Sequence, residues 1–457
     1  MGAPTDVLTQ ALELHQKKRF LEASRLYNAL LNLNPFDETL LFLLGDLYLR
    51  IDHHGLGINL LSNLLQLNPK HADAWANIGI AYRQTYQIDE AIKCWNKAIE
   101  LSGDTVAVCS NMAGIYSDRS RPTEALHWID RALAIDPNMV EAHWQRGLAL
   151  LTMRKWAEGW DEYDYRLKLE QVDTRASLGL PYWDWAPTEH LYIHGEQGVG
   201  DEVMFLSCLD DVLPLAKRVT LELNAKVAGL AQYNWPNVNV ITEVRDGDYT
   251  AKVALGSLAA KYRRTENAFP GIQYLTPNPT RVKNYRKMLE AMGPGPYLAL
   301  TWHGGTIATR FEKRSLQLPL LTPIMERYTC VSGQYESGCP FLTNDRELAG
   351  LAKLDDDCVG GDLHAQAALF KAVDAVVTVQ QTAVHVAGSV GANTLVMVNK
   401  TPHWRYGMEG NLPWYNSVQL IRQQEQDDWA PVIQRVEKEL AHLGTLHRAK
   451  PATARAA

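Results

Sequence analysis

A glycine-rich stretch followed by an acid is the first place where this sequence could carry chemistry. In HLYIHGEQGVGDEVMFLSCL, an apolar run ends at Gly195, Gly198 and Gly200, and Asp201 comes directly afterwards. Glycines let a ligand approach the backbone, and a carboxylate beside them can accept a proton from a bound molecule. Asp is also a favoured cap at the start of a helix, and an apolar helical pattern follows Asp201. The residues alone support a general base and a helix cap equally.

Basic residues follow a later apolar run, in TWHGGTIATRFEKRS. The polar candidates of this segment are His303, Arg310, Lys313, Arg314 and Ser315. Positive side chains after a strand can neutralise a diphosphate, and Arg does so through two hydrogen bonds at once. A solvated basic loop is the alternative interpretation, and for Lys313 it is the favoured one.

A second pattern suited to an anion lies in VQQTAVHVAGSVG, residues 379–391. The chain leaves an apolar run through polar residues and enters a helix of small residues. A helix N-terminus offers free N–H groups and a positive dipole end, both of which suit a diphosphate. His385 is balanced between a ligand contact and a buried core histidine, whereas close helix packing explains Ala387 and Gly388.

Four aromatic residues and two prolines crowd the segment PHWRYGMEGNLPWYNS. Such a loop can stack a base or shape a binding cleft, because aromatic side chains offer large flat surfaces. Clusters of this kind are more often structural. Trp404 and Arg405 are therefore the weak binding candidates of the segment.

The composition limits the classes of partner. Of 457 residues, 46% are hydrophobic and 21% are charged, which predicts a globular chain of about three domains. The formal net charge of -7 argues against nucleic acid and anionic membranes, which require a clustered basic face. Six cysteines without CxxC pairs predict neither a structural zinc site nor a disulfide framework. Without a leader pattern or a membrane-length apolar run, we expect a cytoplasmic protein.

A 34-residue period organises the first third of the chain. Pro35, Pro69 and Pro137 lie on this period, with Gly103 at the missing step. Further sets at the same spacing are Gly45, Gly79, Ala113 and Gly147; Tyr48, Tyr82 and Tyr116; and Ala23, Gly57, Ala91, Ala125 and Gly159. Small residues let two helices approach and prolines end the second helix of each pair. The pattern resembles the tetratricopeptide repeat, and it predicts an α-solenoid over residues 1–170.

After the repeats, short β-rich runs alternate with amphipathic stretches. The strand-length runs are LYIHG, RVTLEL, VNVIT, AKVAL, YLALTWHGG, YTCVSG, DAVVTVQ and NTLVMVNK. This alternation predicts parallel sheets covered by helices on both faces. The polar segment PNPTRVKNYRKMLEAMGPGP divides the runs into two groups, so we expect two lobes with a crevice between them, where ligands bind at the carboxyl ends of strands.

The ordered motifs of this region resemble glycosyltransferases related to bacterial ADP-heptose transferases, in a branch fused to tetratricopeptide repeats. The motifs are GEQGVGDEVMF, KVALGSLAAKY, LTWHGG with RFEKRS, VQQTAVHVAGSVGANTLVMV and PHWRYGMEGNLPWYNSVQLIRQ. The resemblance implies a GT-B fold of two Rossmann-like lobes, an inverting reaction, no metal and no cofactor beyond the nucleotide-sugar substrate. The implied boundaries are 171–285 for the acceptor-side lobe, 286–446 for the donor-side lobe and 447–457 for a disordered tail.

The same resemblance implies roles for individual residues. Asp201 is then the catalytic base that deprotonates the acceptor. The implied donor-binding residues are Gly200, His303, Arg310, Arg314, Ser315, Gln334, Gln381, Thr382, Ala383 and His385. Gln380-Gln381 stands where many heptosyltransferases have Asp-Thr, which leaves the donor sugar open.

Two functions of different classes remain open from the sequence. In the first, the chain is a glycosyltransferase whose repeats present a protein acceptor to the site. In the second, the repeats serve as an interaction scaffold and the GT-B body is catalytically inactive. The intact Asp201, Arg314 and glycine loops favour the first function, and Gln380-Gln381 keeps the second open.

Overall fold

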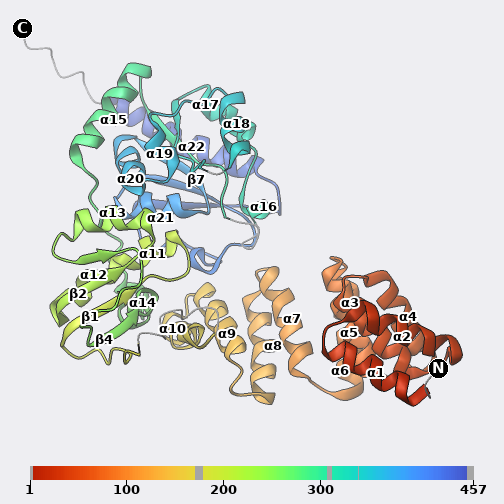
Figure 1. Cartoon of the computed structure of the whole chain (residues 1–457). Helices are drawn as coiled ribbons and strands as arrows, with labels where there is room; N and C mark the ends of the chain where they lie inside the picture. The colour runs from red at the N-terminus through yellow and green to blue at the C-terminus, as the bar shows by residue number, and fades with distance from the viewer. Residues whose placement is uncertain (1–3, 170–178, 306–310, 338, 450–457) are drawn as a thin grey trace, which may run out of the picture. The chain divides into compact units, whose positions relative to one another are not determined.

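The computed structural model describes residues 4–169, 179–305, 311–337 and 339–449. The chain divides into two compact units, Met1–His143 and Trp144–Ala457. The first unit is entirely helical in its described part, and the second contains two parallel sheets with their helices (Figure 1).

Helices of the first unit pack as consecutive pairs, α1 with α2, α3 with α4, α5 with α6 and α7 with α8. Their bounds are α1 Pro4–Gln16, α2 Phe20–Leu33, α3 Glu38–Arg50, α4 His54–Leu67, α5 Ala72–Gln84, α6 Ile88–Ser102, α7 Val106–Asp118 and α8 Pro122–Ile135. The unit ends within α9 (Val140–Thr152). The predicted helical repeat is confirmed.

The 34-residue sets have the packing roles predicted for them. A Cβ on Gly79 would lie 2.4 Å from Nε1 of Trp95, so the glycine admits the indole of the paired helix. Pro35, Pro69 and Pro137 each follow the end of the second helix of a pair by two residues. A further set at the same spacing caps the next helix, because Asp37, His71 and Thr105 each accept a backbone N–H of α3, α5 and α7.

The second unit contains two all-parallel sheets. The first has the order β3-β2-β1-β4, with β1 Thr188–His194, β2 Ala216–Glu222, β3 Asn239–Ile241 and β4 Ala251–Ala254. The second has the order β6-β5-β7-β8-β9, with β5 Tyr297–Leu300, β6 Thr329–Ser332, β7 Ala375–Val379, β8 Thr394–Val398 and β9 Val418–Arg422. Each predicted run contains a strand. The edge strand β9 was missed, because two of its five residues are polar.

Helices cover both sheets, and one buried cluster connects them. The helices are α10 Trp156–Tyr163, α11 Val199–Phe205, α12 Leu209–Val212, α13 Ala225–Asn234, α14 Leu255–Tyr262, α15 Pro279–Met292, α16 Phe311–Arg314, α17 Thr322–Met325, α18 Pro340–Leu348, α19 Asp356–Gly360, α20 Leu363–Ala372, α21 Thr382–Ser389 and α22 Ala430–Ala449. The cluster includes Leu191 of β1, Phe205 of α11, Val384 of α21 and Val376 of β7. Helix α11 packs against α21, so the first turns of two helices from different sheets meet.

Three predicted boundaries differ from the structure. The compact division lies after His143 rather than at 170, because α10 and the short 3-10 helix η1 (Asp164–Lys168) pack with the α/β unit. The boundary at 285 falls inside the continuous helix α15, which packs against α20 and therefore belongs to the second sheet. Residues 447–449 continue α22 rather than beginning a disordered tail, and 450–457 lie outside the described residues.

Candidate functional site

The candidate site lies where β1 and β7 end and α11 and α21 begin. Gly200 is in the first turn of α11, and a Cβ placed there would lie 3.2 Å from Cδ2 of His385 and 3.3 Å from Cα of Thr382. The glycine therefore permits close packing of the two helices, and its contacts in the structure are with α21. Parallel strands place their carboxyl ends at one edge, which is the usual ligand position in open α/β sheets.

Asp201 combines a capping bond with an ion pair. It is the third residue of α11, not the residue before the helix, and it is buried. Its Oδ2 accepts the backbone N–H of Gly198 at 3.2 Å. Its Oδ1 pairs with the guanidinium of Arg405, which lies between β8 and β9 of the other sheet. Burial raises the pKa of Asp201 above its usual value while Arg405 opposes that rise, so the carboxylate is a stronger base than an exposed Asp.

Arg405 lies in the short 3-10 helix η8 (Trp404–Tyr406) and also donates to the ring of His403. Its guanidinium lies 4.8 Å from the ring centroid of Trp404, which is buried against Trp160 and Tyr163. The ring of Trp404 therefore packs against Arg405 and restrains it, and the same ring is buried against Trp160 and Tyr163. Of the two weak candidates, Arg405 reaches the carboxylate of Asp201 and Trp404 packs against Arg405.

Arg314, at the end of α16, contributes a second positive charge. Its Nε is buried without a hydrogen-bond partner among the described residues, and no carboxylate there pairs with its guanidinium. Burial lowers the pKa of Arg314, and the nearby charges of Tyr406 and Arg405 modify it in opposite directions. Arg314 and Arg405 thus face a shared neighbour, Tyr406, whose pKa burial raises.

The histidines of this cluster are neutral at neutral pH. Burial, followed by the charge of Arg405, lowers the pKa of His385 to about 3, and its Nδ1 lies 3.3 Å from the hydroxyl of Tyr415. The pKa of His403 is also well below its usual value, for the same two reasons and through Arg314. The cluster contains two guanidinium groups and one carboxylate, so its cationic groups outnumber its anionic ones. Such a cluster is suited to a bound anion.

Gln334 holds the loop after β5. Its Oε1 accepts the N–H groups of Trp302 and His303, both at 3.0 Å, and its Nε2 donates to the carbonyl of His303 at 3.1 Å. The hydroxyl of Ser315 accepts the N–H of Gly304 at 3.1 Å. Gln334 and Ser315, both predicted to meet the donor, shape this loop through the contacts seen here. Lys313 is exposed, as favoured, and Arg310 lies outside the described residues.

The polar residues between β7 and α21 are buried or half-buried. Gln380 is 1% exposed, and neither its Oε1 nor its Nε2 has a hydrogen-bond partner among the described residues. Gln381 is the N-cap of α21 without a side-chain capping bond, and its Nε2 is likewise unpaired. Thr382 lies beside Gly200, and Ala383 is buried in the core. Unpaired amides at a helix N-terminus mark a place where a polar ligand would be stabilised.

Sequence reasoning missed the residues that support the site. Arg166 and Tyr163 belonged to no motif, because their importance depends on contacts with residues distant in the sequence, and His403 was not singled out within PHWRYGMEGNLPWYNS. The nearest signal was the aromatic density of WAEGWDEYDYRLK and PHWRYG, which marks two segments that pack together.

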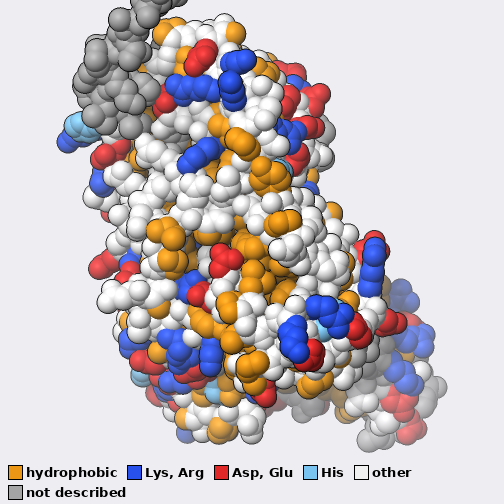
Figure 2. All heavy atoms as spheres, turned by 90° about the vertical axis from the view of Figure 1, so that its left-hand side faces the viewer, with side chains coloured by type: hydrophobic (Ala, Val, Ile, Leu, Met, Phe, Trp, Pro, Cys, Tyr) orange, Lys and Arg blue, Asp and Glu red, His pale blue; other side chains and the backbone are white. Residues whose placement is uncertain are grey.

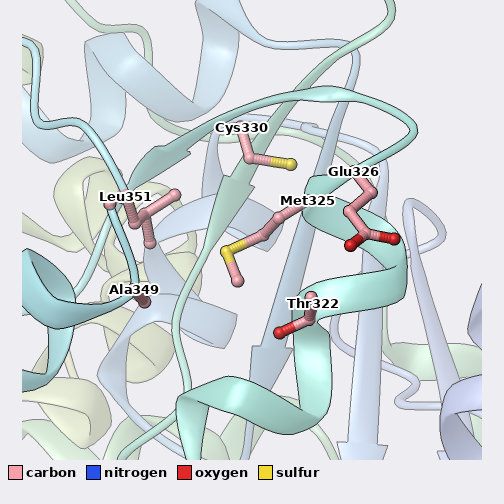
Figure 3. A pocket seen from close by; sticks show the side chains of 7 residues that line it. Thr322, Met325, Glu326, Cys330, Ala349 and Leu351 are labelled. Atoms are coloured by element: carbon pink, nitrogen blue, oxygen red, sulfur yellow. The ribbon is translucent and has the colours of Figure 1, made fainter.

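A separate cavity of about 290 Å³ lies beside the edge strand β6. It is lined by Thr322, Met325, Glu326, Cys330, Ala349, Gly350 and Leu351, and Figure 3 shows Met325 and Leu351 pointing toward one another across it. None of the cluster around Asp201 lines this cavity, so it is not part of the candidate site.

The surface charge, the possible metal ligands and the helix lengths of the described residues bear on the kind of ligand and partner. On the face in Figure 2, Lys and Arg side chains are interspersed with Asp and Glu rather than gathered in one basic patch. In the described ranges, no group of three or more His, Cys, Asp or Glu is arranged to hold a metal ion. The helices that the structure describes are all too short or too polar to cross a membrane.

One family model agrees with the helical repeat, and further comparisons match the same part of the chain. The family model of the tetratricopeptide repeat matches residues 72–105. Over 98 residues, 21% of this chain and 15% of the relative, the sequence is 30% identical to the anaphase-promoting complex subunit cut9 of Schizosaccharomyces pombe. The crystal structure of MamA covers 35% of this chain and 92% of its own, at 22% identity and a TM-score of 0.32. The structure of TTC0263, a tetratricopeptide-repeat protein of Thermus thermophilus, covers 39% of this chain and 96% of its own, at 17% identity and a TM-score of 0.32.

One relative extends beyond the repeats. Protein FlbA of Caulobacter vibrioides is 26% identical over 414 residues, which are 83% of this chain and 68% of that protein. Because the repeats occupy about a third of the chain, this similarity includes the α/β unit. The chain therefore has an N-terminal helical region of tetratricopeptide-repeat type followed by an α/β region with parallel sheets, and its sequence similarity to FlbA extends into both regions.

Proposed function

We propose that this chain is a glycosyltransferase that moves a sugar from a nucleotide-sugar donor to a protein acceptor bound by the repeats. The observation that carries the proposal is the cluster of Asp201, Arg405 and Arg314 at the ends of two parallel sheets. A diphosphate needs fixed positive charge, and an acceptor hydroxyl needs a base. The cluster contains groups of both kinds, and their position at the ends of two parallel sheets is compatible with the proposed GT-B fold.

In the proposed reaction, the carboxylate of Asp201 accepts the proton of an acceptor hydroxyl. The hydroxyl oxygen then forms a bond to the anomeric carbon of the donor, opposite the leaving group. The bond from that carbon to the phosphate oxygen breaks, and its electron pair leaves with the nucleoside diphosphate. Arg405 and Arg314 neutralise the charge that develops on this leaving group, so no divalent ion is required.

The ion pair between Asp201 and Arg405 supports a specific order of events. While Arg405 is paired with Asp201, its attraction opposes protonation of the carboxylate. When the donor diphosphate takes hydrogen bonds from Arg405, that attraction is shared, and the basicity of Asp201 rises. The donor would then bind first and prepare the base for the acceptor.

The scaffold function is the second candidate, and one observation favours it. Asp201 already has an ion-pair partner and a backbone donor, as a purely structural carboxylate would. In that function the repeats bind a protein partner, which tetratricopeptide repeats commonly do, and the α/β unit performs no transfer.

Release of nucleoside diphosphate from a panel of nucleotide sugars tests the two candidates. The full chain is assayed with EDTA present, alone and with the proteins that it captures from its own source cells. Asp201→Asn and the exposed, matched variant Asp248→Asn serve as comparisons. The transferase proposal expects release that Asp201→Asn lowers at least about a hundredfold and Asp248→Asn leaves unchanged. Equal release by wild type and Asp201→Asn, or none with any donor, would favour the scaffold.

A further inference from the structure

Arg166 is fully buried, and every N–H of its guanidinium has an acceptor. Nε donates to Oε2 of Glu196 at 2.7 Å, and Nη2 donates to Oε1 of Glu196 and to the hydroxyl of Ser257. Nη1 donates to the carbonyl of Tyr163 and to the carboxylate of Asp164, at 3.2 and 2.5 Å. A buried arginine with five hydrogen bonds holds its acceptors in one fixed geometry.

Glu196 belongs to the glycine loop that leads from β1 into α11. Its Oε1 also accepts the N–H of Gly256 at 2.9 Å, so the carboxylate ties the loop to the start of α14. The next residue, Gln197, has a φ of +64°, a left-handed conformation that is unfavourable for a residue with a side chain. Such a conformation persists only where neighbouring contacts hold it. The Arg166–Glu196 pair supplies that restraint at the residue before Gln197, three residues before α11 begins at Val199.

The segment that carries Arg166 also supports the other half of the site. Trp160 and Tyr163, on α10, pack against Trp404 with ring centroids 5.8 and 5.6 Å apart. Helix α10 also packs against α14, which lies beside it in Figure 1. Residues 156–168 therefore contact both the loop that leads to Asp201 and the aromatic residue that fixes Arg405.

We infer that Arg166 is a positioning residue for Asp201, acting through Glu196 and the glycine loop. The inference rests on the proposed function, because it gives Asp201 a reaction to perform. Without the pair, the loop at Gln197 can relax to an ordinary backbone conformation, and the first turn of α11 follows it. A displacement of about 1 Å at a reacting group commonly lowers the rate by about a hundredfold.

Four variants separate positioning from stability. Arg166→Met and Glu196→Gln each remove one partner, and we expect both to lower the melting temperature because a buried charge is left unpaired. The double variant removes both charges, and its melting temperature should return close to that of wild type. Arg166→Lys keeps the charge and loses the paired geometry. The control Arg264→Met removes a different link from the same segment, the exposed pair with Asp161.

The folded double variant gives the decisive result. We expect its kcat to stay at least about tenfold below wild type, with the KM for the donor within about threefold. The pH profile of its rate should also differ from wild type, because a displaced Asp201 has a different burial and a different distance to Arg405, the two main influences on its pKa. Arg166→Lys should recover part of kcat, and Arg264→Met should match wild type. A folded double variant with the wild-type kcat and pH profile would overturn the inference.

Hydrogen exchange of the backbone N–H groups of residues 198–204 is measured in the same proteins and needs no substrate. Faster exchange in the folded double variant, with unchanged exchange in Arg264→Met, supports positioning. Wild-type protection in the double variant would overturn it. If wild type transfers no sugar from any donor, the proposed transferase function fails, and hydrogen exchange alone decides whether Arg166 sets this loop.

Discussion

Removing the charge of Asp201 tests the ion pair at the centre of the candidate site. In Asp201→Asn the amide oxygen can still accept the N–H of Gly198, but Arg405 loses its carboxylate. The side chain of Asp201 is 11% exposed and that of Arg405 is 12% exposed, so the variant leaves the largely buried guanidinium of Arg405 without a carboxylate partner. Breaking a buried pair in this way costs about 3 kcal/mol, the lower end of the usual range, because some solvent reaches both groups.

This cost sets the expected change in melting temperature. The α/β unit has roughly 300 residues, and about 2.1 cal/mol/K of unfolding entropy per residue converts 3 kcal/mol into a decrease of about 5 °C. The double variant Asp201→Asn with Arg405→Met leaves no unpaired charge, so it should regain most of that loss. The coupling free energy, which is the sum of the two single losses minus the loss of the double variant, should therefore be at least about 2 kcal/mol, and a double-mutant cycle reports it directly.

Thermal unfolding of the full chain, followed by tryptophan fluorescence, measures the cycle. Asp248→Asn is the matched control, because its carboxylate is 68% exposed and pairs with Arg218 at the surface, and the Asn oxygen can keep the contact with Nδ1 of His190. We expect no measurable shift for the control, since exposed ion pairs contribute little. An Asp201→Asn protein that melts with wild type, together with a coupling free energy near zero, would refute the proposed ion pair.

Three further predictions concern the packing, the pH dependence and the repeats. Gly200→Ala places a Cβ 3.2 Å from His385, so we expect it to destabilise the chain by about 1–3 kcal/mol. The control Gly229→Ala lies at an exposed position of α13 with nothing within 4 Å of its Cβ, so it should stabilise the chain slightly. The pKa of His385 is about 3 in the folded chain, so below pH 6.5 the unfolded chain binds more protons and the free energy of unfolding falls as the pH decreases toward 3. In denaturant titrations, His385→Gln should reduce this loss by about 1 kcal/mol per pH unit. The control His127→Gln, at an exposed position, should leave the loss unchanged. Deleting residues 1–137, which leaves α9 intact, should abolish sugar transfer to the protein acceptor, while hydrolysis of the donor by water should continue to release nucleoside diphosphate. If the folded deletion variant modifies the acceptor as fast as wild type, the repeats do not select the acceptor.

The fold was predictable wherever the sequence repeats or alternates. The 34-residue sets determine packing between helices adjacent in the chain, so Gly79 and Trp95 could be paired without a structure. The apolar runs of the sheets were equally visible, because strands buried on both faces are almost continuously apolar. Strand β9 was missed because Gln419 and Arg422 interrupt its apolar run.

The site was predictable in part. The glycine loop, Asp201, Arg314 and Arg405 were identified from residue type and position after a strand, and the structure brings Asp201 and Arg405 together. Gly200 lies closest to His385 and Thr382 of α21, a contact between helices that the residue type alone does not indicate. Arg166 could not be found, because its five acceptors come from three separate segments. Such contacts follow from the tertiary structure and leave no pattern in one sequence.

Isothermal titration with nucleoside diphosphates in the presence of EDTA tests the central claim most directly. The claim is that the excess positive charge of Arg314 and Arg405 binds the diphosphate of the donor. We predict that wild type binds at least one nucleoside diphosphate without a divalent ion, that Arg314→Met weakens this binding by at least about tenfold, and that Lys313→Met, at the exposed neighbouring position, leaves it unchanged. Equal affinity in wild type and Arg314→Met, or binding that requires a divalent ion, would contradict the assignment of the diphosphate to this cluster.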